Sequence, residues 1–204
     1  MLKDKKIRIA VMVSGGGTNL QALIDSEKAG VISSGEIVLV LSNKADAYAL
    51  TRAQNAGIKA VAVTRAQFGA EFENKIIETL EENNIDLIVL AGFMCILSQN
   101  FTDKFAKRII NIHPSLIPSF CGEGFYGLRV HSAALTKGVK VTGATVHFVN
   151  EIPDGGEIIM QKAVEVMEGD TPETLSARVL ENAEWKILPA ATELVCEKIL
   201  KEEI

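Results

Sequence analysis

One short stretch of the chain places an amide and an imidazole directly before a proline. Asn111 and His113 close an apolar segment, and Pro114 follows them. Side chains alternate between the faces of a strand, so both polar groups are expected on one face. Pro114 cannot donate a hydrogen bond to a sheet, which predicts that the strand ends here. An amide beside a titratable ring suits acyl transfer to an amine, although such a pair is more often structural when it stands alone.

A second candidate site follows the first apolar segment. Gly15 to Gly17 are followed by Thr18, Asn19 and a segment of helical composition. Glycines let the backbone approach an anion, and the free N–H groups of a helix start attract it. The side chain of Thr18 or Asn19 is expected to cap this helix and to bind a phosphate oxygen.

The glycine turn matches neither of two common nucleotide-binding patterns. A Walker A loop needs Lys-Ser or Lys-Thr after the glycines, and a dinucleotide fingerprint needs a third glycine where Leu20 stands. One phosphate of a small metabolite therefore fits best, with a tight turn that binds nothing as the alternative.

A third candidate, Asp154, lies in a segment of turn composition, Pro153–Gly156. Most aspartates in such turns bond only their own backbone. As a neighbour of His113, its carboxylate would favour the protonated ring and orient it. The distance along the sequence neither supports nor opposes that contact.

Apolar segments of strand length alternate with helical segments through the first half of the chain. We expect strands at Ile7–Val13, Ile37–Leu41, Lys59–Val63, Asp86–Ala91 and Arg108–Ile112. Helices are expected between them, at Leu20–Ala29, Ala45–Ala56 and Gln67–Asn83. Repeated β-α units predict an α/β fold, with a doubly wound, mostly parallel, Rossmann-like sheet covered on both faces.

The second half of the chain has a different pattern. Lys140–Val149 and Glu157–Val166 are β-branched runs that predict an antiparallel C-terminal hairpin. The connection before them is expected to be a loop with a short helix. A helix start is predicted at Thr171, and the final helix is expected to run to about Lys198. We find no linker or repeat, so residues 1–204 are expected to form a single domain.

Composition and charge narrow the class of protein. With 48% hydrophobic residues and a net charge of −5, the chain reads as an ordinary soluble protein without a general nucleic-acid partner. Cys95, Cys121 and Cys196 lack metal-ligand spacing and fit free thiols in a reducing compartment. The start of the chain has no apolar signal region, and no apolar run reaches the length of a membrane span. We expect a cytoplasmic protein with no metal and no membrane partner.

Several motifs together resemble a known family over nearly the whole chain. They are Ser14–Ala22, Leu41–Ala47, Val89–Met94, Asn111–Pro118, Gly143–Val149 and Asp154–Gly156. On these segments the chain resembles the glycinamide ribonucleotide formyltransferases, the folate-dependent enzymes of purine synthesis. The segment around Asn111 is shared with other formyl-folate enzymes, and the glycine turn with Ser42–Asp46 narrows the resemblance.

The resemblance implies a reaction and a set of site residues. The formyl group of 10-formyltetrahydrofolate would pass to the amine of glycinamide ribonucleotide without a metal, in a monomer or homodimer. The implied sites are the catalytic residues Asn111, His113 and Asp154, the phosphate-binding residues Gly17, Thr18 and Asn19, the ribose-binding residue Glu184, and the folate-binding residues Met94, Cys95, Ile96, Leu97, Asn111, Glu151 and Asp154. Residues 1 to about 110 would form the phosphate-binding half of a formyltransferase domain, and 111–204 the catalytic and folate-binding half.

The expected chemistry assigns one task to each catalytic residue. Asn111 donates to the developing oxyanion, and His113, expected to be cationic beside Asp154, stabilises the same charge and relays a proton. His147 is interpreted as a packed strand residue, and His131 is expected near a helix start. Cys95 stands where the family is expected to have a basic residue, and Glu157 where proline is common.

Three alternatives remain. A formyl-folate hydrolase would share the catalytic core but usually carries a regulatory domain. A tRNA formyltransferase would usually carry a basic C-terminal domain, which does not fit this acidic chain. A non-catalytic phosphate- or nucleotide-binding module would retain the glycine turn and leave Asn111, His113 and Asp154 with structural roles.

Overall fold

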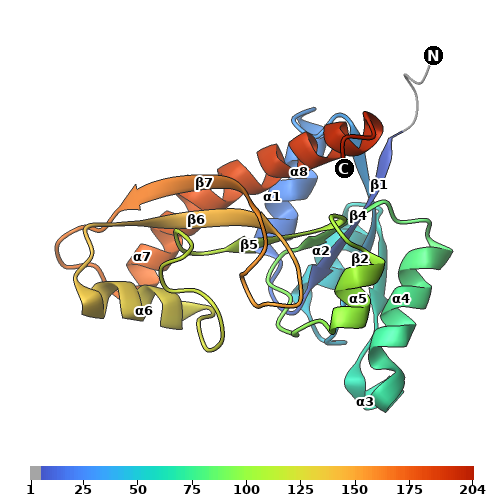
Figure 1. Ribbon diagram of the computed structural model, residues 1–204, viewed down its shortest axis with the longest axis horizontal. Coiled ribbons are helices and arrows are strands. Elements are labelled where there is room, and N and C mark those ends of the chain that lie inside the picture. Colours follow the sequence, from blue (N-terminus) through green and yellow to red (C-terminus); the bar gives the residue numbers. More distant parts are fainter. Residues whose placement is uncertain (1–5) are drawn as a thin grey trace.

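The computed structural model describes residues 6–204, in which one seven-stranded sheet forms the centre (Figure 1). Its strands lie in the order β3-β2-β1-β4-β5-β6-β7. They are β1 (Ile7–Val13), β2 (Gly35–Ser42), β3 (Lys59–Ala62), β4 (Leu87–Leu90), β5 (Ile109–His113), β6 (Val141–Phe148) and β7 (Ile158–Glu165). Neighbouring strands from β3 to β5 are parallel, and β6 is antiparallel to both β5 and β7. The predicted mostly parallel sheet with an antiparallel hairpin is confirmed.

Helices cover both faces of this sheet. They are α1 (Thr18–Lys28), α2 (Tyr48–Asn55), α3 (Arg65–Phe68), α4 (Phe72–Glu82), α5 (Gln99–Lys104), α6 (Leu128–Lys137), α7 (Pro172–Val179) and α8 (Trp185–Leu200), with a 3₁₀ turn η1 (Gly69–Glu71) and a π-helical segment η2 (Leu180–Glu184). Alternate residues of β1 enter two different cores, with Val11 packed beneath α1 and α8 and Met12 packed beneath α4 and α5. This alternation is the period-two pattern of a strand that is buried on both faces.

Three details of the helices differ from the sequence expectations. The helix predicted over Gln67–Asn83 is interrupted at Gly69, whose φ of 52° lies outside the helical region. The six residues of α5 were not predicted, because so short a helix has little periodicity, although Ser98 caps it by accepting the N–H of Phe101. The π-helical segment η2 separates α7 from the last helix, α8, and no simple sequence pattern predicts it.

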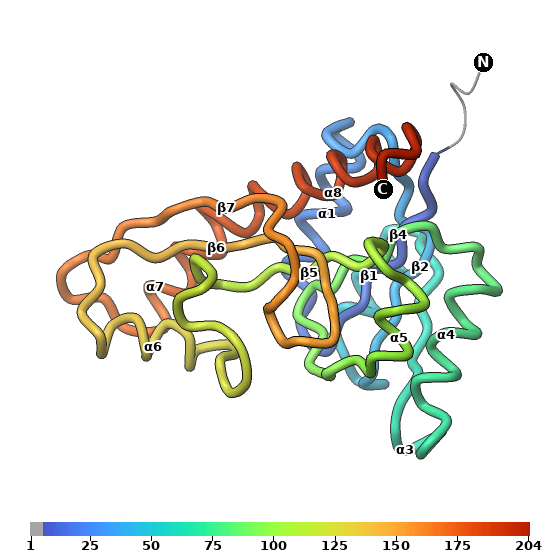
Figure 2. The backbone as a smooth tube through the Cα atoms, in the orientation of Figure 1, coloured from blue at the N-terminus to red at the C-terminus, as the bar shows by residue number. Residues whose placement is uncertain are grey.

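The carboxyl ends of β1, β4 and β5 meet at one edge of the sheet. The chain runs outward from β1 to β2 and β3 on one side, and to β4 and β5 on the other, so the strand order reverses between β1 and β4. Ligands of open α/β sheets bind outside such a reversal. Figure 2 shows the loop after β6, in orange, descending past the end of β5 toward this edge.

Candidate active site

The end of β5 is joined to β6 by an antiparallel register that sets Asn111 opposite His147 and His113 opposite Thr145. The Asn111 amide nitrogen lies 3.2 Å from Nε2 of His147, whose Nδ1 lies 2.7 Å from the carbonyl oxygen of Phe148. A carbonyl accepts only an N–H, so the proton of this ring belongs on Nδ1, and Nε2 accepts from Asn111. One N–H of Asn111 is thereby fixed, and the other remains available for a ligand.

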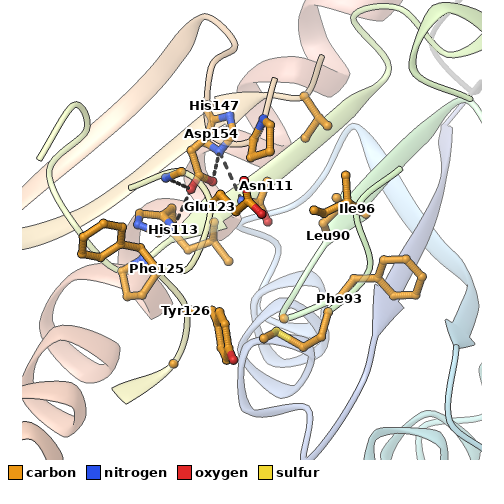
Figure 3. Close-up of a pocket in the computed structure, with 18 of the residues that line it drawn as sticks. Leu90, Phe93, Ile96, Asn111, His113, Glu123, Phe125, Tyr126, His147 and Asp154 are labelled. Atoms are coloured by element: carbon orange, nitrogen blue, oxygen red, sulfur yellow. Dashed lines mark hydrogen bonds and ion pairs between the residues drawn. The ribbon is translucent and has the colours of Figure 1, made fainter. Parts of the chain in front are cut away.

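Asp154 joins the two histidines of this sheet edge (Figure 3). Its Oδ2 lies 3.4 Å from Nδ1 of His113 and its Oδ1 lies 3.4 Å from Nε2 of His147. The backbone N–H of Gly122 donates to Oδ2 at 2.8 Å. On the far side of His113, Nε2 lies 2.9 Å from the carbonyl oxygen of Phe120. The contact between His113 and Asp154, which the sequence left open, is therefore present.

The protonation of this group differs from the sequence expectation. Burial lowers the pKa of His113, and the opposing effects of the Asp154 carboxylate and the Phe120 carbonyl do not restore it. Burial alone would raise the pKa of Asp154, but its contacts with His147 and His113 and the Gly122 N–H hold it below its ordinary value. The lowered pKa of His113 opposes the expectation of a cationic ring in the protein without ligand. In its neutral form the ring donates from Nε2 to Phe120 and turns Nδ1 toward Asp154.

The glycine turn leads directly into α1 and leaves backbone exposed. Gly17 is the N-cap of α1 with a φ of 74°, and a Cβ there would lie 2.6 Å from the Ala49 side chain. Gly15 and Gly16 have no atom within 4 Å of a Cβ placed on them. No side chain caps α1, so the prediction that Thr18 or Asn19 does so is wrong. The Asn19 amide nitrogen bonds elsewhere, and its Oδ1, the atom that would accept in a cap, has no hydrogen-bond partner within residues 6–204.

Asn19 donates to Oε2 of Glu184 at 2.7 Å, which links the glycine turn to the C-terminal helix. Glu184 is the last residue of η2 and is 7% exposed. Burial raises the pKa of Glu184, and the Asn19 hydrogen bond opposes this only in part. Turns of π-helix occur frequently at functional sites, where they redirect a side chain out of the regular helical phase.

One cavity of about 950 Å³ connects these groups. Its walls include Asn19, Met94, Cys95, Ile96, Leu97, Asn111, His113, Glu151, Asp154 and Glu184, which are ten of the twelve residues that the sequence analysis selected. Gly17 and Thr18 are not part of this wall within the described chain. The Sγ atom of Cys95, at the position where a basic residue was expected, accepts a hydrogen bond from Asn43 at 2.9 Å. Met94 and Ile96 are 52% and 68% exposed, so they offer apolar surface to a ligand.

Sequence reasoning missed three contributors to this site. His147 was correctly interpreted as a buried residue, but its contacts with Asn111 and Asp154 depend on the register of β6 against β5, which the sequence does not display. The backbones of Phe120 and Gly122 hold the catalytic pair, and only the glycines of that loop hinted at an unusual conformation. Figure 3 shows Tyr126, from the same loop, facing the cavity across from Phe93.

Within residues 6–204, no group of three histidine, cysteine, aspartate or glutamate side chains is arranged to hold a metal ion. No helix in that range is both long and apolar enough to cross a membrane.

Comparison with known proteins identifies the class. The family model described as Formyl transferase matches residues 7–192, and the chain belongs to this family. A phosphoribosylglycinamide formyltransferase of Haemophilus influenzae is 44% identical over 184 residues, which cover 89% of this chain and 84% of that protein. The glycinamide ribonucleotide transformylase 1 structure from Symbiobacterium toebii superposes with a TM-score of 0.87 at 44% identity, covering 94% of this chain and 88% of that one.

Longer relatives contain a region similar to this chain. The trifunctional purine biosynthetic protein adenosine-3 of Gallus gallus is 50% identical over 196 residues, and the human protein of the same name is 50% identical over 195. These regions cover 95% of this chain but only 19% of each relative. The chain therefore spans about a fifth of the length of these trifunctional proteins.

Proposed function

We propose that this protein transfers the formyl group of 10-formyltetrahydrofolate to the primary amine of glycinamide ribonucleotide, a step of purine synthesis. The observation that carries the proposal is the single cavity in which Asn111, His113 and Asp154 share walls with Asn19 and Glu184 and with the apolar stretch Met94–Leu97. The names of the similar proteins support the same reaction.

Each substrate has a region of the site suited to its chemistry. The phosphate of the ribonucleotide would bind the backbone at Gly17, Thr18 and Asn19, because a helix start presents unpaired N–H groups and a favourable dipole. Glu184 would bind the hydroxyl groups of the ribose. The folate would lie against the wall formed by Met94, Cys95, Ile96 and Leu97, with polar contacts to Asn111, Glu151 and Asp154.

The reaction forms one C–N bond and breaks another. The amine nitrogen of the ribonucleotide attacks the formyl carbon, and the carbonyl oxygen gains negative charge. Asn111 donates its free N–H to that oxygen. The proton lost by the amine is taken by the pair of His113 and Asp154, where Nδ1 of His113 is free to accept it.

Collapse of the intermediate releases the folate. The bond between the formyl carbon and the folate nitrogen breaks, and that nitrogen takes up the proton held by the pair. Because Nε2 of His113 is bonded to the Phe120 carbonyl, direct transfer from that nitrogen requires the loop to shift. Transfer from Nδ1 through Asp154 or a water molecule leaves the loop in place.

A spectrophotometric formyl-transfer assay tests the proposal. Purified protein is mixed with 10-formyltetrahydrofolate, with and without glycinamide ribonucleotide. We expect deformylation of the folate only when the ribonucleotide is present. Equal deformylation without it would identify a hydrolase, and none in either case would leave a phosphate- or nucleotide-binding protein.

The assembly state and partners follow from the same assignment. We propose that the protein works as a monomer or homodimer on small-molecule substrates, without nucleic acid. Light scattering coupled to size-exclusion chromatography distinguishes the two states.

A further inference from the structure

His131 differs from the other two histidines of the chain. It lies on α6, is 2% exposed and forms part of the cavity wall. Its Nδ1 atom is buried and has no hydrogen-bond partner within residues 6–204. In His113 and His147, by contrast, both ring nitrogens lie close to a polar atom of the protein. Buried polar groups are almost always paired in native proteins, so the exception at His131 needs an explanation.

The position of the proton on His131 follows from its surroundings. A buried N–H without an acceptor costs more free energy than a buried lone pair, so the proton of the neutral ring belongs on Nε2. Burial, together with the nearby His113, lowers the pKa of His131 to about 4, and the ring is neutral near pH 7. Nδ1 is buried and His131 lines the cavity, so we assign Nε2 as the ring nitrogen that faces the cavity. The cavity therefore receives one N–H donor from this residue.

The neighbours of His131 indicate which part of a ligand it meets. Helix α6 packs against α7, and Ser176 of α7 lines the same cavity. The chain continues from α7 through η2 to Glu184, another residue of the wall. His131 is also close enough to His113 for that ring to lower its pKa. His131 thus lines the same cavity as Glu184 and His113.

We propose that Nε2 of His131 donates a hydrogen bond to the carbonyl oxygen of the glycinamide chain, and so selects the acceptor substrate. The inference rests on the proposed function, in which Glu184 binds the ribose and the reacting amine lies beside His113. The glycinamide chain must span these two points, and its carbonyl oxygen is its hydrogen-bond acceptor. His131 lines the same cavity as both points, and no hydrogen bond from its Nε2 is found within residues 6–204.

Three substitutions separate a donor at Nε2 from a packing role. His131→Gln retains an N–H₂ group at the distance of Nε2, His131→Asn places one at the distance of Nδ1, and His131→Leu retains neither. We expect calorimetry to show glycinamide ribonucleotide bound about tenfold more weakly by the Asn and Leu variants. The Gln variant should remain within about threefold of the original protein. Thr136→Ala, on the exposed side of α6, is the matched control and should bind normally.

Ribose 5-phosphate provides the matched ligand, because it lacks the glycinamide chain. The inference predicts that all four variants bind it as tightly as the original protein does. Weaker binding of both ligands by His131→Leu would instead assign His131 a structural role and overturn the inference. Equal binding of the ribonucleotide by all variants would overturn it as well. Thermal unfolding of each variant identifies any that fails to fold. The affinities of His131→Gln and His131→Asn for the ribonucleotide then decide whether Nε2 acts as a donor.

Failure of the inference is distinguishable from failure of the proposed function. If the original protein neither binds nor formylates glycinamide ribonucleotide, the proposed function is wrong and the inference falls with it. If the original protein does both and His131→Asn retains full affinity, only the role of His131 is wrong.

Discussion

Two neighbouring strands at the centre of the sheet differ in the polar side chains that they carry. All four residues of β4 are apolar and buried. Strand β5, paired with it in parallel, carries Asn111 and the buried His113, and β6 beyond it buries Thr145 and His147. Burying a polar group costs free energy unless it finds a partner, so β5 and β6 depend on hydrogen bonds that β4 does not need. We therefore expect polar contacts among β1 to β4 to serve stability, and those of β5, β6 and their loops to serve chemistry.

This difference implies that polar substitutions act differently in the two regions. Among β1 to β4, a lost polar contact should change the free energy of unfolding and leave turnover intact. Near β5 and β6, it should change turnover, and removal of an unpaired group should even stabilise the fold. The following predictions test that separation, beginning with the largest effect.

The strongest test compares two aspartates that each accept a backbone N–H. Asp154 accepts from Gly122 at 2.8 Å in the second region, and Asp86 accepts from Arg8 at 2.9 Å in the first. Asp154→Asn should lower kcat by about 10³-fold or more, because an amide cannot hold the proton and disturbs the orientation of His113. Asp86→Asn should leave kcat unchanged and destabilise the fold by about 1 kcal/mol. Comparable losses of kcat in both variants would remove the distinction between the regions.

The loss of folding stability in acid should originate in the second region, around β5 and β6. The pKa of His131 is near its ordinary 6.5 in the unfolded chain and about 4 in the folded protein, so unfolding takes up a proton between these values. Stability is therefore lost as the pH falls from about 6.5 to 4, by an amount on the order of 2–3 kcal/mol from this residue. Part of the loss remains in His131→Leu, because burial also lowers the pKa of His113. Urea unfolding at pH 7 and pH 4 should show a smaller loss in His131→Leu, and an identical loss would contradict the assignment.

Two glycines of the loop before α6 offer a finer comparison. Gly122 and Gly124 have φ values of 85° and 87°, and a Cβ on either would meet no atom within 4 Å. Substitution by alanine at either position should therefore lower the free energy of unfolding by about 1 kcal/mol, through backbone strain and without a steric clash. Alanine keeps the N–H that Gly122 donates to Asp154, but backbone strain at this position displaces it, so Gly122→Ala should also lower kcat, by about tenfold, while Gly124→Ala should not. Equal kcat values in the two variants would show that the loop does not position the carboxylate.

The same separation explains how far the sequence could be interpreted. Strand β1 was predicted residue for residue, because a strand buried on both faces is a continuous apolar run bounded by turn residues. Asn111 and His113 were found because Pro114 marks the end of their strand. These features are local, so periodicity and composition reveal them.

What the sequence did not reveal depends on contacts between distant segments. The proximity of His147 to Asn111 follows from strand register, and the bond between Asn19 and Glu184 joins segments far apart in the chain. The lowered pKa of His113 follows from burial, which a sequence motif does not measure. In each of these three cases a polar group is held by tertiary structure.

The most direct test of the account is the rate of formyl transfer in Asn111→Ala, measured in a single turnover with both substrates bound. The account predicts that both substrates bind with near-normal affinity, and that the chemical step slows by about 10²- to 10³-fold because the oxyanion loses its donor. An unchanged rate with normal binding would contradict the claim that the polar group at the end of β5 performs the transfer.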